Sequence, residues 1–411
     1  MSSRLTQLSL LVAVAAASTS LAGAQVVPRD SLIPRADTAG IRTMVARLEL
    51  ERYKATIKGL TQFGDRRQGT DRNRAAIDWI EAQLKSYGCT NTERLTYDFQ
   101  PQPRPVAQGA AAGAPRNPNG VRPAQGGARI RGITRRTGVQ NDSSAQPDPR
   151  LRALNAQPST PGERQQVWCT KVGTTHPDEM YIVGAHMDGI GWGEAANDDG
   201  SGTALVMELA RVFSSPDVKT ERSIRFVLWN NEETGLNGAQ AYIDQRAALQ
   251  GKEQPAGSGT YPEPRWLGMI QHDMMMFDHG MPLPDGTLPT EQRPEADVNV
   301  EFQSNSKMAE ESQRLAWFFQ AANEFFATDY PATVGRHMTN TDSRPFQDLI
   351  PAISLRENER GAQTGAGWSP HWHQPTDLYS TYSDKDFRLG LNAAQTTLSA
   401  IAVLTGATVG R

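Results

Sequence analysis

The sequence predicts an α/β fold with a mixed, mostly parallel central β-sheet and helices on both faces. Short apolar stretches typical of buried strands alternate with longer stretches of helical spacing; Tyr181–Val183, for example, is followed by a helical pattern from Leu205 to Phe213. Alternation of this kind indicates a sheet covered on both faces. Ligands of such sheets gather at the carboxyl ends of the strands, so the residues that follow each strand are the candidates for a site.

The first 24 residues have the pattern of a secretory signal peptide. Arg4 precedes an apolar run from Leu8 to Ala17, and Ala22-Gly23-Ala24 is a cleavage site of the A-x-A type. The apolar run is too short for a permanent membrane anchor. We therefore expect an exported protein, periplasmic or extracellular. An N-terminal segment at 25–40 follows, for which disorder is an open alternative.

The remaining chain, 41–411, is predicted to be a single domain. Its formal net charge of only −3 gives no electrostatic footprint for nucleic acid, which excludes that class of partner. Cys89 and Cys169 are the only cysteines, and in an exported protein we expect them to form a disulfide. Cys89 follows a helix predicted at 74–87, and Cys169 lies in a strand that could run beside 91–99.

The segment 100–163 interrupts this domain with a different composition. Pro, Gly, Ala, Gln and Arg dominate it, and no aromatic residue occurs between Phe99 and Trp168. Such a segment cannot bury enough apolar surface to offset the entropy of ordering it. We therefore expect a long, mobile insertion. Its arginines could contact nucleic acid or an anionic surface, but solvated disorder is the interpretation that we prefer.

The pattern of ordered elements resumes after the insertion. Apolar runs predict strands at 165–171, 223–229, 267–271 and 351–355, and helical spacing predicts helices at 307–326 and 387–404.

Three predicted strands end in groups that can bind a metal or transfer a proton, and a loop near the C-terminus carries another. One such group alone is weak evidence, because a histidine after a strand is more often a hydrogen-bonded core residue. Charged side chains at buried strand ends are costly unless they are paired or bind a metal, so the repetition indicates a metal site. The groups are His186 with Asp188, Glu232 with Glu233, Asp273, and His373 in the loop.

Five motifs, GAHMDG, NDDGSG, LWNNEETG, QHDM and HQPTD, occur in this order. Together they resemble the secreted zinc exopeptidases of metallopeptidase family twenty-eight. That family includes bacterial leucyl-type aminopeptidases, the plasma glutamate carboxypeptidases and, more distantly, the glutaminyl cyclases. The resemblance covers the chain from about Arg42 onward, apart from the insertion. It implies a zinc-dependent exopeptidase that acts on peptide substrates.

The resemblance implies two zinc ions held by five side chains. Carried onto this sequence, His186 and Asp273 belong to one ion, Glu233 and His373 belong to the other, and Asp198 bridges both. Imidazole and carboxylate are usual zinc ligands, and two cations ~3.5–4 Å apart need a shared anionic ligand. The same ligand types also accept Co²⁺ or Mn²⁺.

Two of these assignments rest on a choice between neighbours. We prefer Asp198 to Asp199 as the bridge because the family places it three residues before the Ser-Gly pair that opens the helix. We prefer His373 to His371 because the family's last ligand has a carboxylate four residues on, matched here by Asp377.

The resemblance also assigns two acidic residues that act beside the metals. Glu232 matches the general base, which takes a proton from the attacking water and returns it to the departing amine. Asp188 would hold the imidazole of His186 in one tautomer. The reaction implied is metal-assisted hydrolysis of an amide bond.

The substrate pocket is the least constrained part of the site. An aminopeptidase needs a closed pocket around a free amino group, whereas a carboxypeptidase needs a cation for a free carboxylate. Arg344 could supply that cation, but we expect it more strongly to be a surface residue. The candidate pocket residues are Trp192, Met274, Arg344, Trp368 and Trp372.

These observations lead to four ranked functions. An aminopeptidase that releases N-terminal residues comes first, and a dipeptide-directed carboxypeptidase of the plasma glutamate carboxypeptidase type comes second. A glutaminyl cyclase comes third, because that branch works with one zinc. A non-catalytic peptide-binding relative would have lost a ligand or Glu232, and the sequence keeps them all.

Overall fold

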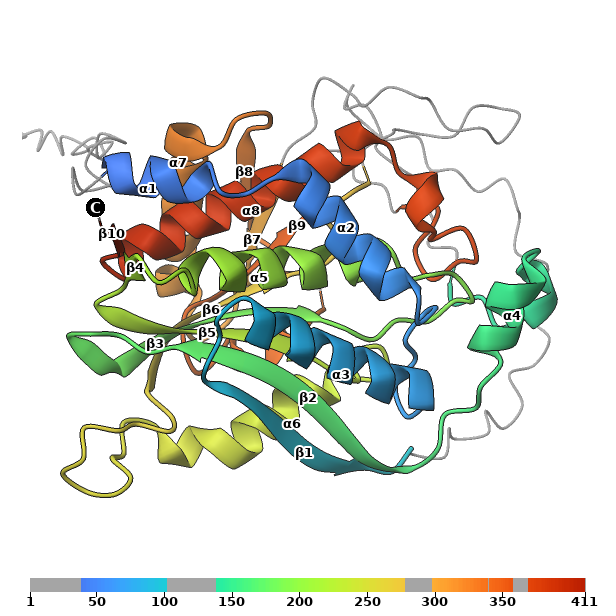
Figure 1. Ribbon diagram of the computed structural model, residues 1–411, viewed down its shortest axis with the longest axis horizontal. Coiled ribbons are helices and arrows are strands. Elements are labelled where there is room, and N and C mark those ends of the chain that lie inside the picture. The colour runs from blue at the N-terminus through green and yellow to red at the C-terminus, as the bar shows by residue number, and fades with distance from the viewer. Residues whose placement is uncertain (1–37, 102–137, 278–297, 339, 358–368, 411) are drawn as a thin grey trace, which may run out of the picture.

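An eight-stranded mixed sheet runs through the molecule in the strand order β1-β2-β5-β3-β6-β9-β7-β8 (Figure 1). The computed structural model describes residues 38–101, 138–277, 298–338, 340–357 and 369–410. Strands β5, β3, β6 and β9 are parallel neighbours at the centre, and β8 is parallel to β7, whereas β1, β2 and β7 join the sheet by antiparallel pairs. The predicted mixed, mostly parallel sheet is therefore confirmed. The strands are β1 (Thr92–Phe99), β2 (Gly162–Lys171), β3 (His176–His186), β5 (Arg222–Trp229), β6 (Arg265–His272), β7 (Val298–Phe302), β8 (Ala332–Gly335) and β9 (Ala352–Arg356), with β4 (Val218–Lys219) and β10 (Thr408–Val409) in a separate pair.

Helices cover both faces of the sheet, because alternate residues of its strands are apolar on both sides. In β5, Phe226 and Leu228 belong to the larger core, whereas Val227 and Trp229 belong to the smaller core on the opposite face. Most helices pack over the larger core, and α6 packs over the smaller one (Figure 1). The helices are α1 (Thr38–Val45), α2 (Leu50–Thr61), α3 (Asp71–Ser86), α4 (Pro149–Asn155), α5 (Gly200–Phe213), α6 (Asn237–Arg246), α7 (Ala309–Phe326) and α8 (Asp384–Leu404).

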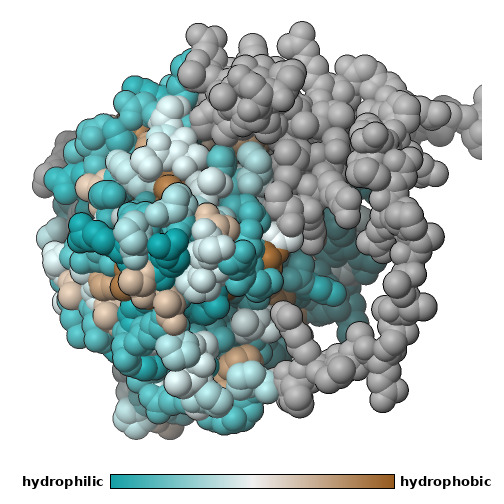
Figure 2. Space-filling view, turned by 90° about the vertical axis from the view of Figure 1, so that its right-hand side faces the viewer, coloured by the Kyte–Doolittle hydropathy of each residue, from teal (hydrophilic) through white to brown (hydrophobic). Residues whose placement is uncertain are grey.

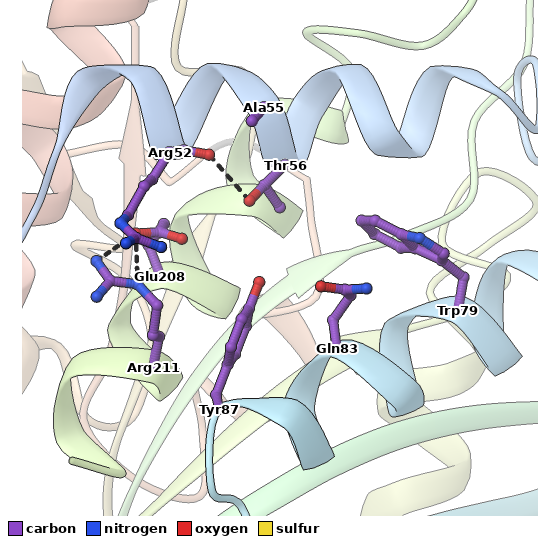
Figure 3. Close-up of a pocket in the computed structure, with 8 residues that line it drawn as sticks. All are labelled: Arg52, Ala55, Thr56, Trp79, Gln83, Tyr87, Glu208 and Arg211. Atoms are coloured by element: carbon purple, nitrogen blue, oxygen red, sulfur yellow. Dashed lines mark hydrogen bonds and ion pairs between the residues drawn. The ribbon is translucent and has the colours of Figure 1, made fainter.

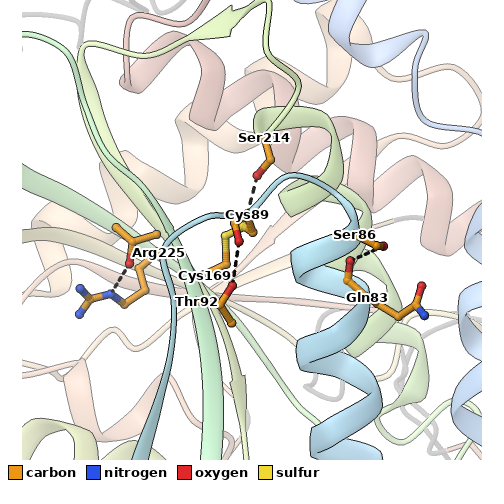
Figure 4. Close-up of a disulfide and its surroundings, with 8 residues drawn as sticks. Gln83, Ser86, Cys89, Thr92, Cys169, Ser214 and Arg225 are labelled. Carbon is orange, nitrogen blue, oxygen red and sulfur yellow. Dashed lines mark hydrogen bonds between the residues drawn. A yellow bond between two sulfur atoms is a disulfide. The ribbon is translucent and has the colours of Figure 1, made fainter.

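The expected disulfide between Cys89 and Cys169 is present (Figure 4). Cys89 follows α3, and β1 begins three residues later with Thr92, which pairs in register with Cys169 of β2. The Cα atoms of the two cysteines are 6.1 Å apart, within the range that a disulfide spans. Both cysteines are buried, so the bond ties the end of α3 to the sheet from the inside.

The segment 138–163 is folded, and the expectation of a mobile insertion over 100–163 is therefore wrong for this part. It contains α4, which Asp148 caps by accepting hydrogen bonds from the first two backbone N–H groups that follow Pro149. The buried Asn155 donates to the carbonyl of Gly193 at 2.8 Å and accepts from the N–H of Asp65 at 3.1 Å. Hydrogen bonds from polar side chains thus hold a segment that has little apolar surface to bury. Residues 102–137 lie outside the described part of the chain.

The structure describes only part of the N-terminal region for which predictions were made. The predicted signal peptide, 1–24, lies outside the described residues, and so does most of 25–40. Helix α1 begins at Thr38, inside the segment for which disorder was an alternative. In the described ranges no helix has the length and apolar character needed to cross a membrane.

A pocket of about 220 Å³ lies between α2, α3 and α5 (Figure 3). Arg211 and Glu208 of α5 form an ion pair at its wall, and Tyr87 and Trp79 close the side formed by α3. Glu208 and Arg211 lie near the C-terminal end of α5. The predicted metal ligands lie near its other end, which begins at Gly200. The pocket is therefore separate from the candidate site.

Candidate metal centre

The five side chains predicted to bind metal come together at the carboxyl ends of the parallel strands. They form two groups of three, and both groups contain Asp198. The first group, which we call the His186–Asp273 half, adds His186 and Asp273. The second, the Glu233–His373 half, adds Glu233 and His373. Within each group the facing nitrogen and oxygen atoms all lie within 4.8 Å of one another.

Two adjacent strands deliver the His186–Asp273 half. His186 is the last residue of β3, Asp273 follows β6, and these parallel strands are in register up to the pair Ala185 and His272. The imidazole Nε2 of His186 consequently lies 3.8 Å from Asp273 Oδ1 and 3.4 Å from Asp198 Oδ1.

A turn and a loop deliver the Glu233–His373 half. Glu233 follows β5, and His373 lies in the loop that leads to α8. His373 Nε2 is 2.9 Å from Glu233 Oε2 and 3.1 Å from Asp198 Oδ2. Asp198 therefore presents Oδ1 to one half and Oδ2 to the other, which is the geometry expected of a bridging carboxylate.

Asp199, the neighbour of Asp198, has a different role. Its Oδ2 accepts a hydrogen bond from the backbone N–H of His186 at 3.2 Å. Its Oδ1 accepts from the N–H groups of Gly202 at 2.8 Å and Met274 at 3.2 Å. The carboxylate thus ties the end of β3, the start of α5 and the residue after Asp273 together, so its oxygens are occupied by backbone groups.

Asp377 fixes the backbone beneath Asp198. Its Oδ1 accepts from the N–H of Asn197 at 2.8 Å and from the Tyr382 hydroxyl at 3.0 Å, and its Oδ2 accepts from the N–H of Asp198 at 3.0 Å. The carboxylate four residues after His373 therefore connects the loop of that histidine to the loop of Asp198.

Arg66 is a structural residue of the site that the sequence analysis missed. Its guanidinium is fully buried and donates to the carbonyl oxygens of Met187 (2.7 Å), Glu194 (2.9 Å), Ala195 (2.8 Å) and Gly64 (3.2 Å). It therefore braces the chain after His186 and the loop before Asp198. No sequence motif marks it, because its partners are backbone carbonyls from distant segments.

Asp188 does not hold the imidazole of His186 through its carboxylate, and this expectation is corrected. The imidazole Nδ1 of His186 lies 2.9 Å from the backbone carbonyl oxygen of Asp188, whereas the nearer carboxylate oxygen is 3.9 Å away. The carboxylate instead accepts from the N–H groups of Glu232 at 3.1 Å and Glu233 at 3.5 Å. The carbonyl thus leaves Nε2 of His186 free to bind metal, and the carboxylate positions the turn after β5.

The carboxylates of the site favour protonated imidazoles. Burial alone would lower the pKa of His373, but Glu233 and Asp198 raise it to about 10. Burial also acts to lower the pKa of His186. Glu232 and Asp198 lie beside this imidazole, and together they raise its pKa well above the ordinary value. A divalent cation would occupy the position of these protons, so metal binding should release them.

Three buried atoms of the two halves have no hydrogen-bond partner in the described part of the protein. They are Asp273 Oδ1, Glu233 Oε1 and His373 Nδ1. Buried carboxylate oxygens without partners are costly, so the two oxygens indicate that something binds between these residues. The donor set of imidazole nitrogens and carboxylate oxygens fits zinc.

Glu232 lies beside the two groups without belonging to either. Its removal from water is the main reason why its pKa is raised well above the ordinary value for glutamate, and Glu233 and Asp342 add to the shift, whereas His186 opposes it. A carboxylate that takes up a proton readily and does not belong to a ligand group suits a general base.

The candidate pocket residues separate into different environments. Trp192 and Trp372 are half-buried, and the ring of Trp372 stacks on the imidazole of His373 with centroids 3.9 Å apart. Met274 is only 1% exposed, which argues against a role as a pocket wall. Arg344 lies on the surface and donates to Asn340. Trp368 lies outside the described residues.

His371, the alternative to His373, is a buried structural residue. Its Nδ1 lies 2.8 Å from Thr376 Oγ1, and its ring packs edge-on against Phe277 and Tyr382. It belongs to neither ligand group.

Figure 2 shows the side of the molecule where α4 and the first turns of α3 and α5 lie in Figure 1. The described part of this surface is mostly hydrophilic, with hydrophobic residues scattered singly or in small groups. It contains no continuous apolar patch of the kind expected for a stable protein interface.

Three comparisons relate this geometry to known proteins. The family model described as "Peptidase family M28" matches residues 167–395. Aminopeptidase YwaD of Bacillus subtilis is 44% identical over 69 residues, which cover 17% of this chain and 14% of that protein. Carboxypeptidase Q of Xenopus laevis is 34% identical over 73 residues, which cover 18% of this chain and 16% of that protein. The alignments with these relatives therefore span less than a fifth of either partner.

A solved structure extends the likeness to nearly the whole chain. The zinc aminopeptidase BSAP from Bacillus subtilis superposes with a TM-score of 0.54 and covers 86% of this chain and 95% of that one, at 16% identity. At that identity the likeness concerns the fold.

Proposed function

Because this chain belongs to peptidase family M28, we propose that it is an exported exopeptidase that uses two zinc ions to release residues from the amino end of peptides. The observation that carries the proposal is the pair of three-residue groups that share Asp198, with Glu232 beside them. Each group offers the imidazole and carboxylate donors that zinc prefers, and the shared carboxylate suits two neighbouring cations.

In this proposal the five side chains divide between the two ions. His186 and Asp273 hold one, Glu233 and His373 hold the other, and Asp198 binds both. When bound, the ions supply polarisation of the scissile carbonyl and a water acidic enough to attack near neutral pH. Cobalt or manganese would fit the same donors.

Glu232 moves the proton. Its carboxylate accepts a proton from the attacking water and delivers it to the nitrogen of the departing amine. The hydrogen bond from its N–H to Asp188 Oδ1 holds it at the turn after β5, within the field of His186.

Replacement of the base tests this assignment. The variant Glu232→Gln should keep both zinc ions and lose roughly a thousandfold or more in kcat, because the amide cannot accept the proton. Zinc content after gel filtration and steady-state kinetics measure the two effects. The exposed Glu163→Gln is the control and should behave like the wild type. Near-normal turnover by Glu232→Gln would exclude Glu232 as the base.

The second candidate is a dipeptide-directed carboxypeptidase, and the sequence likeness to carboxypeptidase Q favours it. Against it, Arg344 is exposed and bonded to Asn340, so it is not directed at a substrate carboxylate. An amino-acid anilide and an N-blocked dipeptide with a free carboxylate separate the two activities. Chelator-sensitive cleavage of the anilide alone supports the aminopeptidase, and cleavage of the blocked dipeptide alone overturns it in favour of the carboxypeptidase.

Export is tested separately. The signal peptide predicted at 1–24 requires that protein recovered outside the cytoplasm begins at Gln25. N-terminal sequencing of the mature chain gives the answer, and a retained Met1 would contradict export by this route.

A further inference from the structure

The pocket between α2, α3 and α5 has a buried carboxylate in its wall (Figure 3). The side chain of Glu208 is only 3% exposed, and its Oε2 accepts hydrogen bonds from Nε of Arg211 at 3.0 Å and from Nη2 at 2.7 Å. Its other oxygen, Oε1, accepts no hydrogen bond from the described residues. Because Glu208 lines the pocket, Oε1 can accept a hydrogen bond from a ligand.

Two guanidinium groups line the same pocket, on either side of this carboxylate (Figure 3). Arg211 also donates through Nη2 to the carbonyl of Arg47 at 2.7 Å, but its Nη1 donates to no residue in the described ranges. The side chain of Arg52 is 56% exposed, and its Nε lies 3.3 Å from a carboxylate oxygen of the exposed Glu49. Such an exposed pair is weak, so both guanidinium groups keep N–H groups for an anion.

Two aromatic side chains of α3, Trp79 and Tyr87, complete the wall and are held in place. Trp79 lies against α2 at Gly59, where a Cβ would come within 2.5 Å of the indole ring. The ring of Phe63 packs edge-on against this indole, with centroids 6.3 Å apart. The hydroxyl of Tyr87 forms a hydrogen bond with the side chain of Thr56 in α2. The apolar part of the wall is therefore fixed by its neighbours.

The charges and the size of the pocket limit what can bind there. Burial is the main reason why the pKa of Tyr87 is raised; Glu208 adds to the shift, and Arg211 and Arg52 oppose it, so all three charges act at one place. Glu208 would repel a simple anion, and the two arginines would repel a simple cation. A ligand that carries both charges close together satisfies both sets of groups. The volume of about 220 Å³ is below the ~300–1,000 Å³ usual for drug-sized ligands, so the ligand is small.

We propose that this pocket binds a free α-amino acid with an apolar side chain. Oε1 of Glu208 accepts hydrogen bonds from the ammonium group, and the guanidinium groups of Arg211 and Arg52 donate to the carboxylate. The side chain of the ligand lies against the rings of Trp79 and Tyr87. None of these residues belongs to either ligand group of the metal centre, so the inference does not depend on the proposed function. A peptidase that releases N-terminal residues would nevertheless produce this class of ligand.

Calorimetric titration of the full chain with L-leucine tests the proposal when the pocket can be blocked. Ala55 is an exposed residue of α2 that lines the pocket, and the indole of Ala55→Trp would fill it. The wild type should bind a leucine that this variant does not bind. A leucine held at the metal centre would be retained by the variant, so the component that is lost measures the pocket alone. Ala82→Trp, at an exposed position of α3 outside the pocket lining, is the control and should bind like the wild type.

Analogues and a charge variant test how the ligand is held. Leucinamide lacks the carboxylate and N-acetyl-leucine lacks the ammonium group, so each should bind in the pocket roughly tenfold or more weakly than leucine. Glu208→Gln keeps the shape of the side chain and should weaken leucine binding by a similar factor, with thermal unfolding as the check that it folds. Equal leucine binding by the wild type and Ala55→Trp overturns the inference. Equal binding of leucine and N-acetyl-leucine also overturns it, because the pocket would then be a site for simple anions, and equal binding of leucinamide would make it a site for cations.

Discussion

The two halves of the candidate metal centre are built from different kinds of structure. His186 and Asp273 stand at the ends of adjacent parallel strands, where neighbouring strands fix their backbones: His186 pairs with Trp229 of β5, and the N–H of Asp273 donates to the carbonyl of Leu355 in β9 at 3.2 Å. Glu233 and His373 stand on a turn and a loop, where hydrogen bonds with the side chains of Asp188 and Gln374 hold the backbone. A sheet therefore positions one half, and a set of polar contacts positions the other.

The loop that carries His373 is held by hydrogen bonds from the segment 138–163, which has little apolar surface to bury. The N–H of Gln140 donates to the carbonyl of His373 at 3.0 Å. The buried side chain of Gln146 donates to the carbonyls of Trp192 at 2.8 Å and Pro375 at 3.2 Å, which joins the two loops around the site. Changes that leave the sheet intact should therefore loosen the Glu233–His373 half more readily than the His186–Asp273 half.

Asp198 belongs to both halves, so its loss should have the largest effect. Asp198→Asn removes the shared negative charge, and we expect the protein to lose both ions and roughly a thousandfold or more in kcat/KM. Replacement of a ligand in one half, as in His186→Ala or His373→Ala, should remove one ion only. Zinc content after gel filtration compares the three variants. Two ions retained by Asp198→Asn would show that the halves do not share this ligand.

In the His186–Asp273 half, which is built on strands, His272 should make the folded protein less stable at acid pH. It is the last residue of β6. Burial lowers the pKa of this histidine to about 4, and its ring bonds the carbonyl of Gly184 at 3.1 Å and the hydroxyl of Thr397 at 2.8 Å. The unfolded chain binds a proton below about pH 6.5, whereas the native ring stays neutral until about pH 4, so stability is lost as the pH falls through this window. The expected contribution of His272 is a loss of about 2 kcal/mol between pH 7 and pH 5, read as the difference between the wild type and a variant without this histidine.

Denaturant unfolding of the metal-free protein in excess chelator measures this loss without a contribution from metal release. His272→Asn keeps a donor near the position of Nδ1 and should show a much smaller change between pH 7 and pH 5. His337→Asn alters an exposed histidine and should lose as much stability as the wild type. Equal losses in all three proteins would place the acid sensitivity elsewhere.

The strand-built half was also the more predictable one. The apolar stretch Tyr181–Val183 lies inside β3, and the run predicted at 267–271 lies inside β6, because a run of apolar residues marks a buried strand. Short or polar elements gave no such signal, and β7, β8, α2 and α6 were missed. The residues that support the site were missed for a related reason: Arg66 binds backbone carbonyls, and Arg356 pairs with Asp273, a residue 83 positions away. The sequence does carry a signal for Arg356, which is a charged residue at the end of the apolar strand β9.

The smallest expected effect tests the loop-built half through Gln146. Gln146→Ala leaves two carbonyls of the site loops without their donor, and we expect a loss of about 1–2 kcal/mol in unfolding free energy. Zinc release from the Glu233–His373 half to a chelator should become several times faster, while release from the His186–Asp273 half is unchanged. The control is Gln157→Ala, in the same segment, whose side chain bonds Asp71 of α3 rather than the site loops. If the two variants release zinc at the same rates, the segment 138–163 does not support the loop of His373, and the two halves are equally independent of it.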